Sequence, residues 1–480
     1  MGGMRPITFN RAWPLHGGAA TRQLEARAIA AAGPHVLMQR AGLAAARLAL
    51  ALAPHARQVW IACGPGNNGG DGLEAAMHLQ HWGRKPCVRW FGDECRLAPD
   101  AAASLARARA AGVPFTEVTP ELQPQDLAID ALLGLGNTRR ATGDLADCIA
   151  ALNASAAPVL AIDLPTGLAA DTGQADGPAV RAQHTLSLLT LKPGLFTGMG
   201  RDLAGQVWFD ALQQGGAAQA DATLAGPPPA RTRAHASHKG NYGDVAVLGG
   251  APGMRGAAVL AGSAALHAGA GRVYVATLDA SASDLAPDAP ELMWRAPAEL
   301  ALARLTLACG CGGGPQVAAW LPQVLAEAAQ LVLDADALNA LAADKRLQDG
   351  LRRRQQPTVL TPHPLEAARL LGNSTAAVQA DRPAAAQALA ERFGAVVVLK
   401  GSGSVVAAPG HTPSINPTGN ARLATAGTGD VLAGFVAAHL AAGSSAWEAA
   451  CHAVYQHGAL ADAWPAGQAL TASALARAAS

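Results

Sequence analysis

The sequence carries little charge for its length. Only 15% of the 480 residues are charged, and 36 Lys and Arg against 35 Asp and Glu leave a formal net charge of +1. No block of like charges stands out, which argues against a nucleic-acid partner and against a charged membrane-binding arm. Half of the residues are hydrophobic, enough to build two cores. We therefore expect two domains and a small-molecule partner.

Long apolar segments are also absent. No stretch approaches the roughly 18–20 apolar residues that span a bilayer. The segment MGGMRPITFNRAWPLHGG at the amino terminus lacks the apolar core of a signal peptide. Pro6 stands where a myristoylation motif has Ser or Thr. These absences predict a cytoplasmic protein without a membrane partner.

Cysteines in metal-binding pairs are missing. The seven cysteines are scattered and include no CxxC pair, so neither a disulfide framework nor a zinc site is predicted. Cys309 and Cys311 flank one glycine. A redox role is one interpretation of this pair, and the packing of small residues in a glycine turn is the favoured one. We expect reduced thiols.

What the sequence does contain is a recurring unit of short apolar strand, turn and alanine-rich helix. Such continuous apolar strands are typical of a mostly parallel sheet covered on both faces. Two helices within 21–50 are expected to cover the sheet edge. Residues 213–243 are rich in Gly, Ala and Pro, which predicts a boundary near 220–235. The expected strands are 59–63, 88–91, 127–133, 159–164 and 185–191, then 244–248, 272–277, 305–308, 331–333, 358–360 and 396–399.

The fold class predicted from this pattern is α/β, with two tandem three-layer domains at 1–225 and 226–480. The first domain is expected to be Rossmann-like, a doubly wound layer. In an open parallel sheet, ligands bind at the carboxyl ends of the strands. Asp130 and Asp163 each end an expected strand, and Asp71 follows another, so these three acids should converge on one crevice. A lone strand-end Asp is often only a turn cap, but three together favour a site.

The turn GPGNNGGDG, residues 64–72, lacks the Lys of a phosphate-binding loop. Its glycines permit close backbone approach, and the helix that follows points free N–H groups at the turn. Glycines alone would be weak support, because such turns are often structural. The added Asn67, Asn68 and Asp71 offer oxygen atoms to a cation, a sugar or an amide.

These motifs resemble the epimerase domain of the bifunctional NAD(P)H-hydrate repair enzymes. The resemblance covers LMQRAG, GPGNNGGDGLEAAMHL, DALLGLGNTRR and AIDLPTGL in the expected order. It implies a potassium ion held by Asn68, Asp130 and Thr166, with Asp163 facing the substrate as a catalytic residue. GLGNTRR differs from the expected variants of its loop. The substrate-binding residues implied are Asn67, Asn68, Gly69, Gly70, Asp71 and Asp163, with a second loop of Gly134, Leu135, Gly136, Asn137, Thr138, Arg139 and Arg140.

A second site is predicted from Gly427, Thr428, Gly429 and Asp430, directly before a helix. Backbone amides and the positive helix end form an anion hole for a transferring phosphoryl group. An acid at its mouth would be repelled by phosphate unless it accepts the proton of the attacking hydroxyl. The alternative is that Asp430 is only a first-turn residue that favours the helix dipole.

This arrangement resembles the ribokinase-like superfamily, and SHKGNYGDVAVLGG, LVLDADALN, TPHPLEAARLL and VVVLKGSGSVVA narrow the resemblance to its NAD(P)H-hydrate dehydratase branch. The superfamily alone does not fix a substrate. CGCGGGP departs from the expected pattern, with Cys311 in place of Pro. The resemblance implies hydrate contacts by Ala258, Gly314, His363 and Asp430, and nucleotide contacts by Lys400, Gly401, Ser402, Gly403, Ser404, Gly427, Thr428 and Gly429.

Together the resemblances imply an enzyme that epimerises R and S hydrates of NADH and NADPH and dehydrates the S form with ADP and Mg²⁺, releasing AMP and phosphate. We also expect a homo-oligomer. Two alternatives stay open: a vitamin or sugar kinase fused to a nucleotide sensor, and a first domain that is a noncatalytic scaffold. A kinase would accumulate a stable phosphorylated product with ATP, and a scaffold would not need its three acids.

Overall fold

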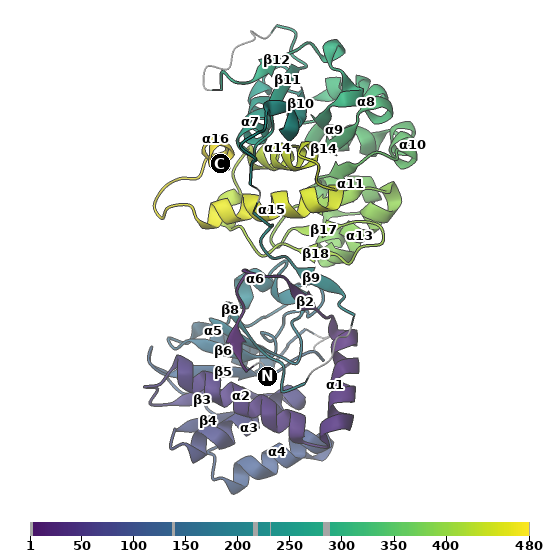
Figure 1. The fold of residues 1–480 in the computed structure, drawn as a ribbon. Coiled ribbons are helices and arrows are strands. Elements are labelled where there is room, and N and C mark those ends of the chain that lie inside the picture. Colours follow the sequence, from purple (N-terminus) through teal and green to yellow (C-terminus); the bar gives the residue numbers. More distant parts are fainter. Residues whose placement is uncertain (1–2, 137–139, 215–218, 231, 282–288, 480) are drawn as a thin grey trace. The chain divides into compact units, whose positions relative to one another are not determined.

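The computed structural model describes residues 3–136, 140–214, 219–230, 232–281 and 289–479 (Figure 1). The chain divides into two compact units, residues 1–8 with 13–222 and residues 9–12 with 223–480. Each unit is an α/β layer, so the predicted fold class is confirmed. The short segment 9–12 belongs to the second unit, which was not expected from its position in the chain.

The first unit is built on a sheet in the order β1-β8-β7-β6-β5-β3-β4, parallel throughout except that β1 runs antiparallel to β8. Successive strands step outward in both directions from the gap between β3 and β5, the switch point at which ligands bind such sheets. The strands of this sheet are β1 (Arg5–Pro6), β3 (Val59–Cys63), β4 (Pro86–Trp90), β5 (Leu127–Ala131), β6 (Val159–Ile162), β7 (His184–Leu188) and β8 (Gln206–Asp210). The short strand β2 (Trp13–Leu15) lies outside it.

Helices cover both faces of this sheet because alternate strand residues are apolar in both directions. Ile61 and Ile129 belong to one core cluster with residues of the second, third and fourth helices, whereas Trp60 and Ala128 belong to another with residues of the fifth. The result is the three-layer arrangement expected. The helices are α1 (Gly18–Ala32), α2 (Val36–Leu52), α3 (Asn67–His81), α4 (Pro99–Ala110), α5 (Asp144–Ala154) and α6 (Gly200–Leu203).

The second unit has a sheet in the order β12-β11-β10-β13-β14-β15-β16-β17-β18-β9. Strands β10 to β16 pair in parallel, and β17 turns back antiparallel on β16. The strands are β9 (Ala222–Leu224), β10 (Asp244–Gly249), β11 (Arg272–Thr277), β12 (Met293–Trp294), β13 (Thr306–Cys309), β14 (Gln330–Leu333), β15 (Thr358–Leu360), β16 (Val396–Leu399), β17 (Val405–Ala407) and β18 (Ser414–Ile415).

Four helices of this unit, α7, α14, α15 and α16, share one large core with the sheet, and α14 is buried along most of its length. None of the described helices is long and apolar enough to cross a membrane. The helices are α7 (Arg255–His267), α8 (Leu321–Glu327), α9 (Ala335–Ala343), α10 (Lys345–Arg353), α11 (Pro364–Leu371), α12 (Thr375–Ala380), α13 (Arg382–Phe393), α14 (Thr428–Ala441), α15 (Ala446–Asp462) and α16 (Ala472–Arg477).

Three predicted strands of the first unit were too long at their carboxyl ends. The runs 127–133, 159–164 and 185–191 stop as strands at Ala131, Ile162 and Leu188. The apolar pattern continues past these points, but the backbone bends: Asp163 and Leu189 have φ of 68° and 62°. The residues beyond the strands border the candidate site, so the error falls at the edge where ligands bind.

Two candidate active sites

The turn between β3 and α3 folds tightly against the end of β5. A Cβ at Gly64 would lie 1.7 Å from the carbonyl oxygen of Leu132, and one at Gly69 would lie 1.9 Å from the carbonyl oxygen of Gly64. Only glycine fits such approaches, so the glycines serve backbone packing here. Helix α3 begins at Asn67, which places its free N–H groups beside the turn.

A cavity of about 410 Å³ opens at this turn. Its lining combines apolar and acidic side chains, which suits a ligand with a ring and polar substituents. Helix α1 forms part of the wall and so does more than cover a sheet edge. Predicted site residues that border the cavity are Asn67, Asn68, Asp71, Gly134, Leu135, Gly136 and Asp163, and residues not predicted include Thr21, Arg22, Glu25, Met38, Leu188 and Lys192.

Asp130 and Thr166 form a buried hydrogen-bonded pair, whereas Asn68 borders the cavity close to Gly134. The Oδ2 of Asp130 accepts from the Thr166 N–H at 2.7 Å, and its Oδ1 accepts from the Thr166 hydroxyl at 2.7 Å. Burial raises the pKa of Asp130 to about 6, against these hydrogen bonds. Asn68 is 8% exposed, and neither its amide oxygen nor its nitrogen has a hydrogen-bond partner in the part of the chain that the structure describes. The orphaned amide oxygen of Asn68 fits a bound cation.

Lys192 is the functional residue that sequence reasoning missed. It is fully buried, and its ammonium donates to Oδ1 of Asp163 and, at 2.8 Å, to the carbonyl oxygen of Leu188. A lysine followed by Pro193 after a strand suggests an exposed loop, so nothing in the pattern indicated a buried ion pair. Lys192 follows β7 by a few residues, at the sheet edge where the predicted acids lie, and this position was the one sign of a functional role.

Two further carboxyl groups border the cavity. Burial, followed by repulsion from Asp163 and Glu25, raises the pKa of Asp71 well above its ordinary value. Burial and Asp163 likewise raise the pKa of Glu25, which projects from α1. Glu25 was not predicted, because its alanine-rich helix was interpreted as a cover. The crevice therefore gathers Asp71 and Asp163, two of the three predicted acids, with Glu25 in addition. The third, Asp130, is fully buried and does not border the cavity.

Gly69, Gly70 and Arg140 were also predicted to bind substrate, but they do not border the cavity. Gly70 packs against Met38, where a Cβ would lie 2.6 Å from the sulfur. Arg140 is exposed, and its side chain lies beside Gly177. Asn137, Thr138 and Arg139 lie outside the described residues. Their expected contacts with substrate stay predictions, as does that of Gly69.

In the second unit, the Gly-Thr-Gly-Asp turn starts α14 as predicted. Gly427, the residue before the helix, has φ of 89°, a conformation that favours glycine. The Thr428 hydroxyl lies 2.8 Å from the Leu423 carbonyl oxygen and 2.9 Å from that of Thr425, which fixes the turn from within. Burial, followed by repulsion from Asp334, raises the pKa of Asp430 to about 7. A carboxyl group with that pKa suits a general base near neutral pH.

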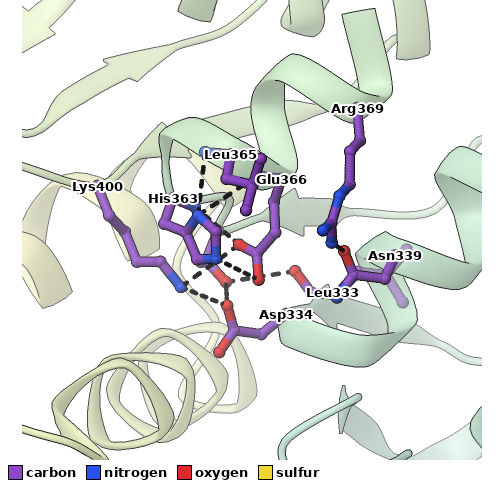
Figure 2. A network of polar contacts seen from close by, with 9 residues as sticks. Leu333, Asp334, Asn339, His363, Leu365, Glu366, Arg369 and Lys400 are labelled. Atoms are coloured by element: carbon purple, nitrogen blue, oxygen red, sulfur yellow. Dashed lines mark hydrogen bonds and ion pairs between the residues drawn. The ribbon is translucent and has the colours of Figure 1, made fainter. Parts of the chain in front are cut away.

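Figure 2 shows Lys400 pointing toward Asp334. Its ammonium donates to Oδ1 of Asp334 at 2.7 Å, and Glu366 lies 4.0 Å away. Burial alone would lower the pKa of Lys400, but the two carboxyl groups outweigh it and the pKa is raised. A Cβ added at Gly429 would lie 3.5 Å from the ammonium. A charged lysine therefore stands beside the anion hole.

His363 caps helix α11 through its own side chain. Its Nδ1 accepts from the N–H groups of Leu365 and Glu366 at 3.1 and 3.3 Å, and its N–H donates to Glu366 at 2.7 Å (Figure 2). Burial, followed by Lys400, lowers the pKa of His363. Burial raises the pKa of Glu366 to about 7. The imidazole is thus fixed in orientation as a neutral ring, with 46% of its side chain exposed.

Cys311 lies between the acids of this site. One ligand atom each from Cys311, Asp334 and Asp430 fall within 4.8 Å of one another. Burial, followed by the charge of Asp430, raises the pKa of the Cys311 thiol well above its ordinary value. The buried thiol therefore favours its protonated form. Packing in a glycine turn is therefore only part of its setting.

The other predicted residues of the second site differ in their exposure. Ser404 closes the loop after β16, with its hydroxyl 3.1 Å from the Gly401 carbonyl oxygen. Gly314 has φ of 57° and donates its N–H to Asp336 at 2.8 Å. Ala258 is 0% exposed and belongs to the core, so it offers no surface to a ligand here. The ligand contacts of Ala258, Gly314 and the loop 400–404 stay predictions.

Comparisons with known proteins cover both units. Residues 34–194 match the family described as YjeF-related protein N-terminus, and residues 245–480 match the family described as NAD(P)H-hydrate dehydratase. A dehydratase structure from Bacillus subtilis, described as ADP/ATP-dependent and co-crystallized with ATP/Mg²⁺, is 32% identical, with a TM-score of 0.45. The match covers 52% of this chain and 91% of that one.

Curated relatives match over nearly their whole length. The bifunctional NAD(P)H-hydrate repair enzyme of Escherichia coli is 37% identical over 454 residues, which cover 89% of this chain and 84% of that protein. The enzyme of the same name from Coxiella burnetii is 34% identical over 466 residues, which cover 93% of this chain and 94% of that protein. The chain therefore belongs to the family of bifunctional NAD(P)H-hydrate repair enzymes.

Proposed function

We propose that the first unit interconverts the R and S hydrates of NADH and NADPH, and that the second unit dehydrates the S hydrate to regenerate the reduced dinucleotide. The observation that carries this assignment is the presence of two different sites in one chain. One is a cavity with a lysine-paired carboxylate, and the other is an anion hole with Asp430 at its mouth. The first suits proton and hydroxyl chemistry, and the second suits phosphoryl transfer.

In the second unit, the ring hydroxyl of the hydrate attacks the terminal phosphorus of the nucleotide while Asp430 accepts the hydroxyl proton. The Gly427 to Gly429 amides and Lys400 stabilise the charge on the transferring group. The lone pair of the ring nitrogen then expels phosphate, and loss of a proton from the adjacent carbon restores the double bond. With ADP as the donor, the by-products are AMP and phosphate.

Magnesium supplies positive charge to the nucleotide phosphates when it is bound. It prefers oxygen ligands and usually keeps several waters, so the phosphates themselves are its main partners. Of the buried carboxyl groups near Lys400, Asp334 and Glu366 offer the matching donor atoms. We infer that ADP is used in preference to ATP, an inference for which the resemblance is the only support.

Potassium is our proposal for the cation behind the first cavity. Asn68, Asp130 and Thr166 supply only oxygen ligands, and the unpartnered amide of Asn68 supports a cation there. The cation would fix the loop after β5, because the Leu133 N–H donates to the Thr166 hydroxyl at 3.0 Å. We also retain as proposals a cytoplasmic location and a homo-oligomeric assembly.

A single assay tests the proposed function. Purified protein is mixed with both hydrate epimers and with ADP or ATP, and recovery of reduced-nicotinamide absorbance is followed. Complete recovery of both epimers is expected, because epimerisation feeds the S form to the dehydratase. Recovery that stops at the S fraction would contradict the epimerase. A stable phosphorylated product accumulating with ATP would instead support the kinase alternative.

A further inference from the structure

The cavity of the first unit contains more acids than a dinucleotide needs for binding. Four carboxyl groups and two cationic side chains border it. Only Asp163 among these carboxyl groups forms an ion pair with one of these two cations in the described residues. Arg22 is exposed and donates to the Leu135 carbonyl oxygen at 3.1 Å. The remaining acid, Asp100, lies 2.7 Å from His35. The bordering charged groups are Glu25, Asp71, Asp100, Asp163, Arg22 and Lys192.

Lys192, the buried cation of this site, forms its ion pair with Asp163. The Lys192 side chain is 0% exposed, and its ammonium donates to Oδ1 of Asp163. The Leu188 N–H lies 3.3 Å from the same oxygen. The Asp163 side chain keeps 12% of its surface exposed and borders the cavity. Asp163 is thus an anchored carboxylate whose second oxygen is left for the ligand.

Asp71 is in the opposite situation. Among the described residues, none donates a hydrogen bond to the Asp71 carboxyl group. Besides burial, the main effects on its pKa come from other acids. The charged groups that face it are Asp163, Glu25 and Glu74, which raise its pKa, and Lys192, which lowers it less. Burial and the neighbouring acids therefore favour the protonated form of this carboxyl group, which borders the same cavity.

We propose that the epimerase works with two carboxyl groups of unlike charge: Asp163 is an anion held by Lys192, and Asp71 is the acid that carries the exchangeable proton. Lys192 is the positioning residue that establishes this division, because it is bound to one carboxylate and not to the other. The proposal rests on the epimerase activity proposed above and assigns roles within that site.

The chemistry of a ring hydroxyl beside nitrogen requires such a pair. The C–O bond breaks as the nitrogen lone pair forms a C=N bond, and the oxygen leaves as water with the proton of Asp71. The resulting ring cation lies next to the Asp163 carboxylate, which offsets its charge. Water then adds to the other face of the ring, and its proton returns through solvent to Asp71. No oxidant or reductant is needed.

The test begins with the pH profile of kcat/KM for epimerisation in the parent protein. One carboxyl group must be ionised and the other protonated, so a bell-shaped profile is expected. In Lys192→Met, an anion without its cation accepts a proton more readily, and the acidic limb should move up by about 1 to 3 pH units. A misplaced but unaltered pair of carboxyl groups would lower the rate without moving that limb.

The dehydratase of the same chain is the internal control for folding, assayed on pure S hydrate with ADP. An unmoved acidic limb in Lys192→Met with normal dehydratase activity overturns the proposal. If Lys192→Met loses both activities, the decision passes to Asp71→Asn. That variant should bind the hydrate in calorimetry yet epimerise about 10² to 10⁴ times more slowly. Epimerisation within a few-fold of the parent would exclude Asp71 as the acid. A parent protein without epimerase activity would contradict the proposed function itself.

Discussion

At the scale of single residues, the two proposed catalytic acids, Asp163 and Asp430, have different surroundings. Asp163 is ion-paired with a buried lysine, whereas Asp430 stands near Asp334 and has a pKa raised to about 7 by burial and that neighbour. A paired carboxylate suits permanent charge, and a carboxyl group that titrates near neutrality suits proton transfer. The two residues are of one type, and their surroundings assign their roles.

Replacing Asp430 with Asn should leave ADP binding intact while slowing the chemical step by about 10² to 10⁴. The amide keeps the shape of the turn, and removing the carboxylate removes its repulsion from the phosphates. The measurement is ADP affinity beside single-turnover recovery of NADH. Turnover within a few-fold of the parent would mean that Asp430 is only a first-turn residue.

The pH dependence of the same variant provides a second check. In the parent, dehydration should rise as pH passes about 7, where Asp430 ionises, and this limb should vanish in Asp430→Asn. The folded pKa is raised above the unfolded value of 3.8, so the contribution of Asp430 to stability falls as pH rises from about 4 to about 7 and then levels off. Thermal unfolding at pH 8 should therefore show the variant to be at least as stable as the parent.

Potassium in place of sodium should strengthen hydrate binding to the first unit. Asn68 has two buried polar atoms without partners among the described residues, and a weakly hydrated cation with several oxygen ligands would satisfy its oxygen. Calorimetric titration of the Asp430→Asn protein with hydrate, in potassium and in sodium buffers, measures the effect. Equal affinities in the two buffers would count against the cation site. Asn68→Leu should remove any difference that is found.

At the scale of elements, the close approach of the β3–α3 turn to the end of β5 is the feature that places the first site. Gly64→Ala would push a methyl group into the Leu132 carbonyl, so we expect a loss of roughly 1–3 kcal/mol in stability and reduced epimerisation. Gly66→Ala is the matched control in the same turn, because a Cβ there meets nothing within 4 Å. Equal melting temperatures for the two variants would contradict this account.

Much of the element pattern could be predicted because buried parallel strands are continuous apolar runs. β3, β11, β15 and β16 begin and end where the sequence indicated. The strand β8 was missed, since QVWFD mixes exposed and apolar residues, and so were the short strands β17 and β18. Within the first site, Asp71 and Asp163 could be predicted because the topology places the ends of parallel strands at one edge. Lys192 and Glu25 were not, because burial of a charge depends on the partner that tertiary packing supplies.

At the scale of the whole molecule, the two activities should be separable by single substitutions. Asp163→Asn should abolish epimerisation while leaving ADP-dependent repair of pure S hydrate intact, because its side chain belongs to the first unit and Asp430 to the second. Equal loss of both activities in a folded Asp163→Asn protein would refute this separation.

A mixture of the two variants tests the same point from the other side. Asp163→Asn supplies a working dehydratase, and Asp430→Asn supplies a working epimerase, so together they should repair both epimers. Each variant alone should fail on the R hydrate. The rate of the mixture compared with the parent then measures what joining the sites in one chain contributes.

The small segment 9–12 has a consequence for how the chain comes apart. It belongs to the second unit although the first unit surrounds it in sequence, and the Tyr455 hydroxyl donates to the Phe9 carbonyl oxygen at 2.9 Å. A protease that cuts the chain once near residue 226 would therefore produce two fragments that stay associated. The carboxyl-terminal fragment would still bind segment 9–12 of the amino-terminal fragment. Two bands in denaturing electrophoresis with a single native elution peak are the expected signature.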